Sequence, residues 1–210
     1  ISMIKVAIVD DHQLFRQGLA VILSSKENIQ VVGKYESAIA LLNQIDDLDI
    51  DLVLMDIDMP EMDGITATVE VLAIRPNVKV VILSMHLNSI KIQEAISAKV
   101  SGYLLKTSSD VEVANAIETV MNGKDYFSQE AQQELIESYR KKEDPNYSEL
   151  TKREIDILRL VCQELNSQEI ADKLFISKHT AETHRRNLLS KIDCKNSVGL
   201  VKFAMDNGYI

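Results

Sequence analysis

The sequence predicts a doubly wound α/β domain with five parallel strands, followed by a smaller all-α domain. Three observations lead to this prediction. Apolar runs of strand length alternate five times with helix-length segments before residue 125, as in successive βα units. Four of these runs, at residues 4–9, 52–55, 78–83 and 103–105, are nearly continuous in apolar residues, which is typical of parallel strands buried on both faces. After residue 146 the pattern is helical, and the net charge changes from −10 before that residue to +1 from it onward.

The first domain accounts for ten elements. The expected strands are residues 4–10, 29–35, 51–56, 79–84 and 102–105, and the expected helices are residues 13–24, 37–45, 64–75, 88–99 and 109–122. Ser108 or Ser109 can cap the last of these helices, and Gly123 can end it. A charged stretch at residues 140–146, interrupted by Pro145, indicates a linker. We therefore expect domains at residues 3–125 and 148–210, joined by a helix and linker at 126–147, with Ile1 and Ser2 as a remnant outside the fold.

The second domain has the spacing of a helix-turn-helix. Thr151 and Glu154 fit a capping box, and Ser167, Ser177 and Ser197 can each cap a later helix. Helices at 168–174 and 178–192, separated by a tight connection, would place the second helix in a DNA major groove. Residues 173–195 carry a local net charge of +4, the sign that phosphate neutralisation requires. The expected core of this motif is Ile170, Ala171, Leu174, Ile176, Leu188, Leu189 and Ile192.

The composition excludes several classes of protein. No apolar stretch has membrane-spanning length, and the N-terminus lacks a charged region followed by an apolar one, so we expect a soluble, cytoplasmic protein. Cys162 and Cys194 are the only cysteines. They form no metal-binding pair and no disulfide framework, and two isolated thiols in a reducing compartment are expected.

Four of the expected strands end in residues suited to phosphoryl chemistry. The first ends at Asp10 and Asp11, the third at Asp56, the fourth at Ser84 and the fifth at Lys106. Ligands bind outside the carboxyl ends of the strands in an open parallel sheet. Three carboxylates there would repel one another without a cation, and Mg²⁺ fits hard oxygen ligands. A carboxylate beside Mg²⁺ can become an aspartyl phosphate, with the ammonium and the hydroxyl binding the phosphoryl oxygens. Helix capping could explain Asp10-Asp11 or Asp56 separately, but it does not explain suitable residues at all four strand ends.

Together these positions resemble the receiver domain of bacterial response regulators. The resemblance is carried by Asp10-Asp11, residues 55–60 (MDIDMP), Gly64, Ser84 and residues 102–106 (GYLLK). It implies a flavodoxin-like sheet and phosphorylation of Asp56 by a histidine kinase. It also implies Mg²⁺ ligation by Asp11, Asp56 and the backbone carbonyl of Asp58, with Asp10 acting through water. Ser84 and Tyr103 resemble a switch pair, in which Ser84 moves toward the phosphoryl group and Tyr103 turns inward.

Three positions bear on how far this resemblance extends. Thr107 follows Lys106 where many receivers have a proline, so the cis peptide common there is in question. Asp58 and His86 correspond to positions that line the route of water to the phosphoryl group. They either tune the lifetime of the acyl phosphate or are simply polar loop residues.

The second domain resembles the LuxR-type DNA-binding domain, and the two together resemble the NarL/FixJ layout of transcriptional regulators. The matching residues are 150–154 (LTKRE), 169–171 (EIA), Ile176-Ser177, Thr180, His184, Asn187 and Lys191-Ile192. The sequence departs from the family at residues 164–168 and at Glu182, where many members carry a lysine. The resemblance implies DNA contacts by Lys178, Thr180, Glu182, Thr183, Arg185, Arg186 and Lys191.

Within this set the roles differ. Arg186 could contact guanine, whereas Lys178, Arg185 and Lys191 would hold the DNA backbone. Glu182 could accept a hydrogen bond from a cytosine amino group, or it could pair with Arg185 or Arg186 along the helix. His184 is expected to be packed rather than to bind metal. LuxR-type domains pair through their last helix, which makes Val198, Val201 and Met205 candidate dimer contacts.

We therefore expect a two-component response regulator. Its phosphoryl group would come from a cognate histidine kinase, and it would bind double-stranded promoter DNA as a homodimer. No enzymatic activity is expected beyond self-phosphorylation and slow autodephosphorylation. A phosphorylation-independent regulator or adaptor is one alternative. An aspartyl-phosphate-forming phosphatase is another, because residues 56–58 (DID) fit the D-x-D of haloacid-dehalogenase phosphatases. That motif follows the first strand in those enzymes, but here it follows the third.

Overall fold

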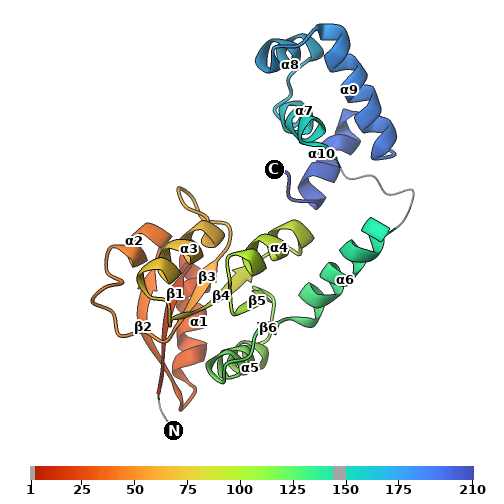
Figure 1. Ribbon diagram of the computed structural model, residues 1–210. Coiled ribbons are helices and arrows are strands. Elements are labelled where there is room, and N and C mark those ends of the chain that lie inside the picture. The colour runs from red at the N-terminus through yellow and green to blue at the C-terminus, as the bar shows by residue number, and fades with distance from the viewer. Residues whose placement is uncertain (1–2, 144–149) are drawn as a thin grey trace. The chain divides into compact units, whose positions relative to one another are not determined.

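The computed structural model describes residues 3–143 and 150–210 (Figure 1). The chain divides into two compact units: the first extends to Leu135, and the second begins at Ile136 and also takes in the short segment Asn88–Ile90. Residues 140–143, expected in the linker, belong instead to helix α6 (Gln129–Glu143). The rest of the expected linker, the expected domain start at residue 148 and the first two residues lie outside the described part of the chain.

The first unit is built on one parallel sheet. Its strands are β1 (Ile4–Val9), β2 (Ile29–Tyr35), β3 (Leu52–Asp56), β4 (Lys79–Ser84), β5 (Gly102–Leu105) and β6 (Tyr126–Phe127), in the order β2-β1-β3-β4-β5-β6. The expectation of five strands was one too few. β6 has two residues, and a strand that short carries no readable apolar period.

Helices cover both faces of this sheet (Figure 1). Helices α1 (Gln13–Ser24) and α5 (Asp110–Met121) bury residues such as Leu23 and Ile117 against one face. On the other face, α2 (Ala38–Leu42), α3 (Gly64–Ile74), α4 (Ser89–Ser97) and the first part of α6 bury residues such as Leu41, Val71 and Ile92. Because helices cover both faces, the inner strands β1, β3, β4 and β5 are largely apolar, whereas the edge strand β2 exposes Gln30 and Lys34.

The second unit is helical in its described residues. It contains α7 (Lys152–Cys162), α8 (Ser167–Leu174), α9 (Lys178–Lys191) and α10 (Ser197–Asp206). The expected core is confirmed, since Ile170, Ala171 and Leu188 are buried and the other four expected residues pack against them. Among the described residues, no helix is both long enough and apolar enough to span a membrane.

Local capping agrees with the sequence at some helices and differs at others. Ser109 caps α5, Ser177 caps α9, and the Thr151–Glu154 capping box starts α7. Asn166 and Asn196 cap α8 and α10, where Ser167 and Ser197 were expected. In both cases an Asn directly precedes the Ser, and its side-chain oxygen accepts the amide hydrogen bonds, so the Ser becomes the first helical residue.

Candidate functional site

The first candidate site lies at the carboxyl ends of β1 and β3, which are neighbours in the sheet although they are not consecutive in sequence. This is the point where the strand order reverses, and α/β sheets bind ligands there. Asp10 and Asp56 are almost fully buried at these ends. The Nζ atom of Lys106, at the end of β5, lies 2.7 Å from Asp10 Oδ2 and 2.8 Å from Asp56 Oδ2. The structure therefore brings together the carboxylates and the ammonium that the sequence singled out.

The protonation of Asp56 and Lys106 follows from this burial and pairing. The pKa of Asp56 is raised to about 6, mainly because the carboxyl is buried; the ion pair with Lys106 opposes this rise, and the charge of nearby Asp10 adds to it. Burial alone would lower the pKa of Lys106, but its close pairing with the Asp10 and Asp56 carboxylates outweighs burial and raises that pKa. Lys106 is therefore a permanent cation beside a carboxylate whose ionic form is costly.

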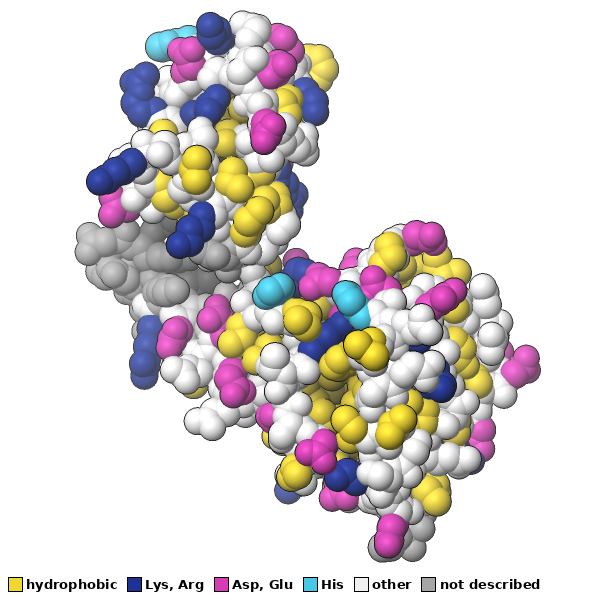
Figure 2. All heavy atoms as spheres, turned by 180° about the vertical axis from the view of Figure 1, so that it is seen from behind, with side chains coloured by type: hydrophobic (Ala, Val, Ile, Leu, Met, Phe, Trp, Pro, Cys, Tyr) yellow, Lys and Arg dark blue, Asp and Glu magenta, His cyan; other side chains and the backbone are white. Residues whose placement is uncertain are grey.

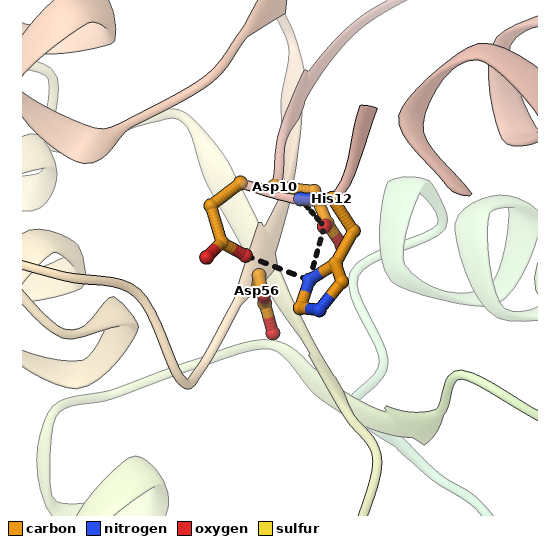
Figure 3. A group of neighbouring side chains, drawn as sticks. Asp10, His12 and Asp56 are labelled. Atoms are coloured by element: carbon orange, nitrogen blue, oxygen red, sulfur yellow. Dashed lines mark hydrogen bonds and ion pairs between the residues drawn. The ribbon is translucent and has the colours of Figure 1, made fainter. Parts of the chain in front are cut away.

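A metal ion could bind on the outer side of this pair. Ligand atoms of Asp10, Asp11, His12 and Asp56 all lie within 4.8 Å of one another. The His12 Nδ1 atom is 2.7 Å from Asp11 Oδ1 and 3.4 Å from Asp10 Oδ1, and Figure 3 shows its ring turned back toward Asp10. Three carboxylates against one ammonium leave an excess of negative charge, and their oxygen atoms suit Mg²⁺.

His12 was missed by the sequence analysis, although it directly follows the acidic pair. It stands at the N-cap of α1 but makes no side-chain cap, because its imidazole is directed to the carboxylates. Phe15 was also missed, and its ring lies under the Lys106 ammonium, 5.0 Å from centroid to Nζ. These two residues are in the first turns after β1, so proximity in sequence to Asp10 was the available signal.

Ser84 and Tyr103 are buried, and both contact the backbone of His86. The Ser84 hydroxyl donates to the His86 carbonyl at 2.7 Å, and the Tyr103 hydroxyl lies 3.5 Å from that same oxygen. Tyr103 is fully buried, so it already occupies the inward position that the resemblance associated with switching. Burial raises its pKa to about 12. The exposed His86 takes part through its backbone in these contacts.

Asp58 and the residue after Lys106 occupy the loops around this edge. The Asp58 carboxylate is half-exposed and pairs with Lys91 on α4. Lys91 was not singled out from the sequence, since it lies 33 residues away along the chain. None of the described peptide bonds is cis, including the one between Lys106 and Thr107.

The second candidate site is the exposed surface of α9. Lys178, Glu182 and Arg186 are exposed, and Thr180 and Thr183 are half-buried. Figure 2 shows Lys and Arg side chains spread over the visible face of this unit, with acidic side chains among them. In the part of the chain that the structure describes, Glu182 has no ion pair with Arg185 or Arg186. His184 is half-buried.

Two basic residues that were expected to contact DNA instead make side-chain contacts with other helices of the same unit. The Arg185 guanidinium donates to the hydroxyls of Ser167 and Ser197, each at 3.1 Å. Lys191 Nζ lies 2.9 Å from Glu154 Oε2, and both side chains are largely buried. These contacts join α9 to α8, α10 and α7. They indicate a structural role that sequence spacing did not reveal.

Helix α10 carries an apolar strip on its outer side. Val198 is 75% exposed and Met205 is 63% exposed, and the half-buried Val201 lies between them at helical spacing. Leu200 faces the opposite way and is fully buried in the core of the unit. The expected dimer contacts are therefore accessible on the described surface.

Comparison with protein families matches both halves of the chain. Residues 6–118 match the response regulator receiver domain, and residues 148–204 match the bacterial regulatory proteins of the luxR family. The response regulator protein VraR of Staphylococcus epidermidis is 34% identical over 207 residues, which covers 99% of each chain. VraR of Staphylococcus aureus is 33% identical over the same length and coverage.

Solved structures with a similar fold include two response regulators. ChrA, from a heme-sensing two-component system, has 32% identity and a TM-score of 0.60, with both chains fully covered. The RcsB–DNA complex has 25% identity and a TM-score of 0.69 over 98% of this chain and 99% of that one.

Proposed function

The chain belongs to the response regulators that join a receiver domain to a LuxR-type DNA-binding domain, and we propose that Asp56 is its phosphoacceptor. It is a phosphorylation-controlled DNA-binding regulator. We assign residues 3–125 to the receiver, to whose sheet β6 and the first turns of α6 are added up to Leu135, and residues 148–210 to the DNA-binding domain. The observation that carries the assignment of Asp56 is its burial beside Lys106 at the reversal point of the strand order.

Phosphorylation of Asp56 is a displacement at phosphorus. A carboxylate oxygen of Asp56 forms the new O–P bond as the N–P bond of a kinase phosphohistidine breaks, and the histidine keeps the electron pair of the bond that breaks. Lys106 can then pair with the phosphoryl oxygens instead of the carboxylate. Ser84, released from the His86 carbonyl, can donate its hydroxyl to another of these oxygens.

The donor set supports Mg²⁺ as the cofactor. Asp11, Asp56 and the backbone carbonyl of Asp58 would hold the ion, and Asp10 would act through a bound water. When bound, Mg²⁺ supplies charge neutralisation for the phosphoryl oxygens. The observation behind this assignment is the closeness of the acidic ligand atoms, within 4.8 Å of one another.

The exposed surface of α9 supports DNA as the partner of the second domain. RcsB, which has the same fold over nearly the whole chain, has been solved with DNA. We assign DNA contact to Lys178, Thr180, Glu182, Thr183 and Arg186, and pairing of two copies to the outer strip of α10. A protein that binds promoter DNA works in the cytoplasm of a bacterium, and its cognate partner would be a histidine kinase.

We also propose that the chain is not an enzyme for external substrates. Its chemistry would be limited to its own phosphorylation and a slow loss of the phosphoryl group. Asp58 and His86 would influence that loss, because both lie on loops beside Asp56. Incubation with p-nitrophenyl phosphate should release no more product than buffer alone.

The test uses acetyl phosphate and Mg²⁺ with the full chain and with Asp56→Asn. Intact mass, oligomeric state and binding to double-stranded DNA are followed on the same samples. We expect a phosphoryl adduct, a shift from monomer to dimer and tighter DNA binding in the wild type alone. An adduct on Asp56→Asn would overturn the assignment. DNA binding that is equal with and without the adduct would favour a phosphorylation-independent regulator.

A further inference from the structure

A segment between the two family matches is built into the receiver sheet. The matches end at residue 118 and resume at residue 148, yet β6 and the start of α6 lie between them. β6 pairs in parallel with β5, with Phe127 opposite Tyr103. The backbone amide of Ser128 donates to the Tyr103 carbonyl at 2.9 Å. The segment is therefore bonded directly to the backbone of the switch tyrosine.

Ser128 also starts helix α6. Its side-chain oxygen accepts from the Ala131 amide at 3.3 Å, and its carbonyl accepts from the Gln132 amide at 3.0 Å. Ser128 is fully buried, whereas N-cap residues are commonly at the surface. The Gln132 side chain returns to donate to the Phe127 carbonyl at 2.7 Å. One buried residue thus holds Tyr103 on one side and begins α6 on the other.

The first turns of α6 pack into the same apolar cluster as Tyr103. Ala131 is fully buried in this cluster, which also contains Ile92 of α4, and the partly buried Leu135 packs against the cluster. The Tyr103 hydroxyl approaches the His86 carbonyl, which also accepts from Ser84. A continuous set of contacts therefore runs from the Ser84 hydroxyl to the first turn of α6.

We infer that Ser128 is a positioning residue that couples the phosphoryl-dependent movement of Ser84 to the docking of α6. This inference rests on the proposed function of Asp56. When Ser84 turns toward a phosphoryl group, the His86 carbonyl loses its strong donor. The His86 carbonyl, which the Tyr103 hydroxyl approaches, is then no longer held in place, so Tyr103 and β5 become more mobile. Because Ser128 is bonded to the Tyr103 backbone, the first turn of α6 is released from the edge of the sheet. Since α6 continues out of the receiver unit, its release changes the segment that leads to the DNA-binding domain.

The test measures amide hydrogen exchange along the full chain. In the unmodified protein, Ser84→Ala removes the hydroxyl donor, and Ser128→Ala removes the α6 cap. Both are expected to raise exchange in residues 129–140 several-fold. Ser109→Ala is the matched control, because Ser109 caps α5 by the same type of bond, to the Glu112 amide at 3.2 Å, but does not contact Tyr103. It should leave exchange in α6 unchanged.

A second arm adds Mg²⁺ with beryllofluoride, a phosphoryl mimic. Exchange in α6 should rise in the wild type and in Ser109→Ala. It should not rise further in Ser128→Ala, where the helix is already released. The inference is overturned if Ser84→Ala leaves α6 exchange at the wild-type rate, or if Ser128→Ala responds to beryllofluoride as Ser109→Ala does. The Ser84→Ala measurement needs no phosphorylation. It can therefore fail while an Asp56 adduct still forms in the mass measurement, or succeed when no adduct forms.

Discussion

Gly64 lies directly against the backbone of Asp56. A Cβ atom placed on Gly64 would be 2.1 Å from the Asp56 carbonyl oxygen, and the Gly64 amide donates to the Ile57 carbonyl at 3.0 Å. Here the first residue of α3 closes the loop that follows β3. Because residue 64 has no side chain, its backbone can approach the Asp56 backbone this closely.

Gly64→Ala should distort this loop, since a backbone oxygen cannot give way as a flexible side chain can. We expect a loss of about 1–3 kcal/mol in the free energy of unfolding and a clear fall in the rate of phosphorylation by acetyl phosphate. Gly18→Ala is the control, because a Cβ there meets nothing within 4 Å and should slightly stabilise α1. Equal phosphorylation rates for the two variants would contradict this account.

Asp56→Asn should stabilise the metal-free protein at neutral pH. The pKa of Asp56 is raised from 3.8 to about 6, so its contribution to stability is full below pH 3.8 and is lost as the pH rises through 6. At pH 7.5 the ionised carboxylate costs about 3 kcal/mol. Urea unfolding in EDTA should show the variant gaining on the wild type between pH 4 and 7. A gain that does not change with pH would argue against the burial of this charge as the cause.

Asp63 provides a comparison in which the pKa of a carboxyl group is shifted downward instead of upward. Burial would raise its pKa, but hydrogen bonds from Thr66 and Ile65 outweigh burial and lower it. Its contribution to stability is therefore present above its unfolded pKa and is lost as the pH falls. Asp63→Ala should destabilise α3 by about 1 kcal/mol at neutral pH, and less in acid.

His12→Asn should change which divalent cations bind beside Asp56. Imidazole nitrogen favours Zn²⁺ and Co²⁺ over Mg²⁺, which prefers oxygen. We expect the affinity for Co²⁺ to fall by roughly tenfold while the affinity for Mg²⁺ is retained, as measured by calorimetry and by the visible absorption of Co²⁺. His86→Asn is the control, because that side chain is not among the clustered ligand atoms. An unchanged Co²⁺ spectrum would remove His12 from the site.

Lys178 and Lys191 should have different roles although both are on α9. Lys178 is exposed, so Lys178→Ala should reduce the slope of log K against log salt by about 1 on random-sequence duplex DNA. Lys191 pairs with Glu154 in a largely buried contact, so Lys191→Ala should mainly lower the melting temperature. Anisotropy titrations and thermal unfolding of both variants separate the two effects. A reversed pattern would contradict the assignment.

Val198→Asp together with Met205→Asp should prevent pairing of two chains through α10. Both side chains are more than half exposed, so the isolated fold should change by no more than about 0.5 kcal/mol. Sedimentation of the phosphorylated protein with DNA should show one chain bound per site instead of two. Phe175→Asp is the control, since Phe175 is 95% exposed but lies between α8 and α9. Dimers that survive the double substitution would place the contact elsewhere.

Much of the receiver site could be predicted from local sequence. Strands β1, β3, β4 and β5 are largely apolar runs in the sequence, and each is followed by or ends in a polar residue, which points to Asp10, Asp56, Ser84 and Lys106. The convergence of these residues then follows from a rule about parallel sheets. Strand β6 could not be found in this way, because its two residues become a strand only by pairing with β5.

The tertiary structure decided which chemically equivalent residues do what. Lys178 and Lys191 cannot be told apart by residue type, and the sequence does not show that the Ser84 hydroxyl donates to the His86 carbonyl. Contacts between residues far apart in the sequence separate them, as the pairing of Lys191 with Glu154 does. The sequence determined the elements and the chemistry at their ends, because periodicity and capping act within a few residues. Only packing determined partners, because burial and hydrogen bonding depend on which segments the fold brings together.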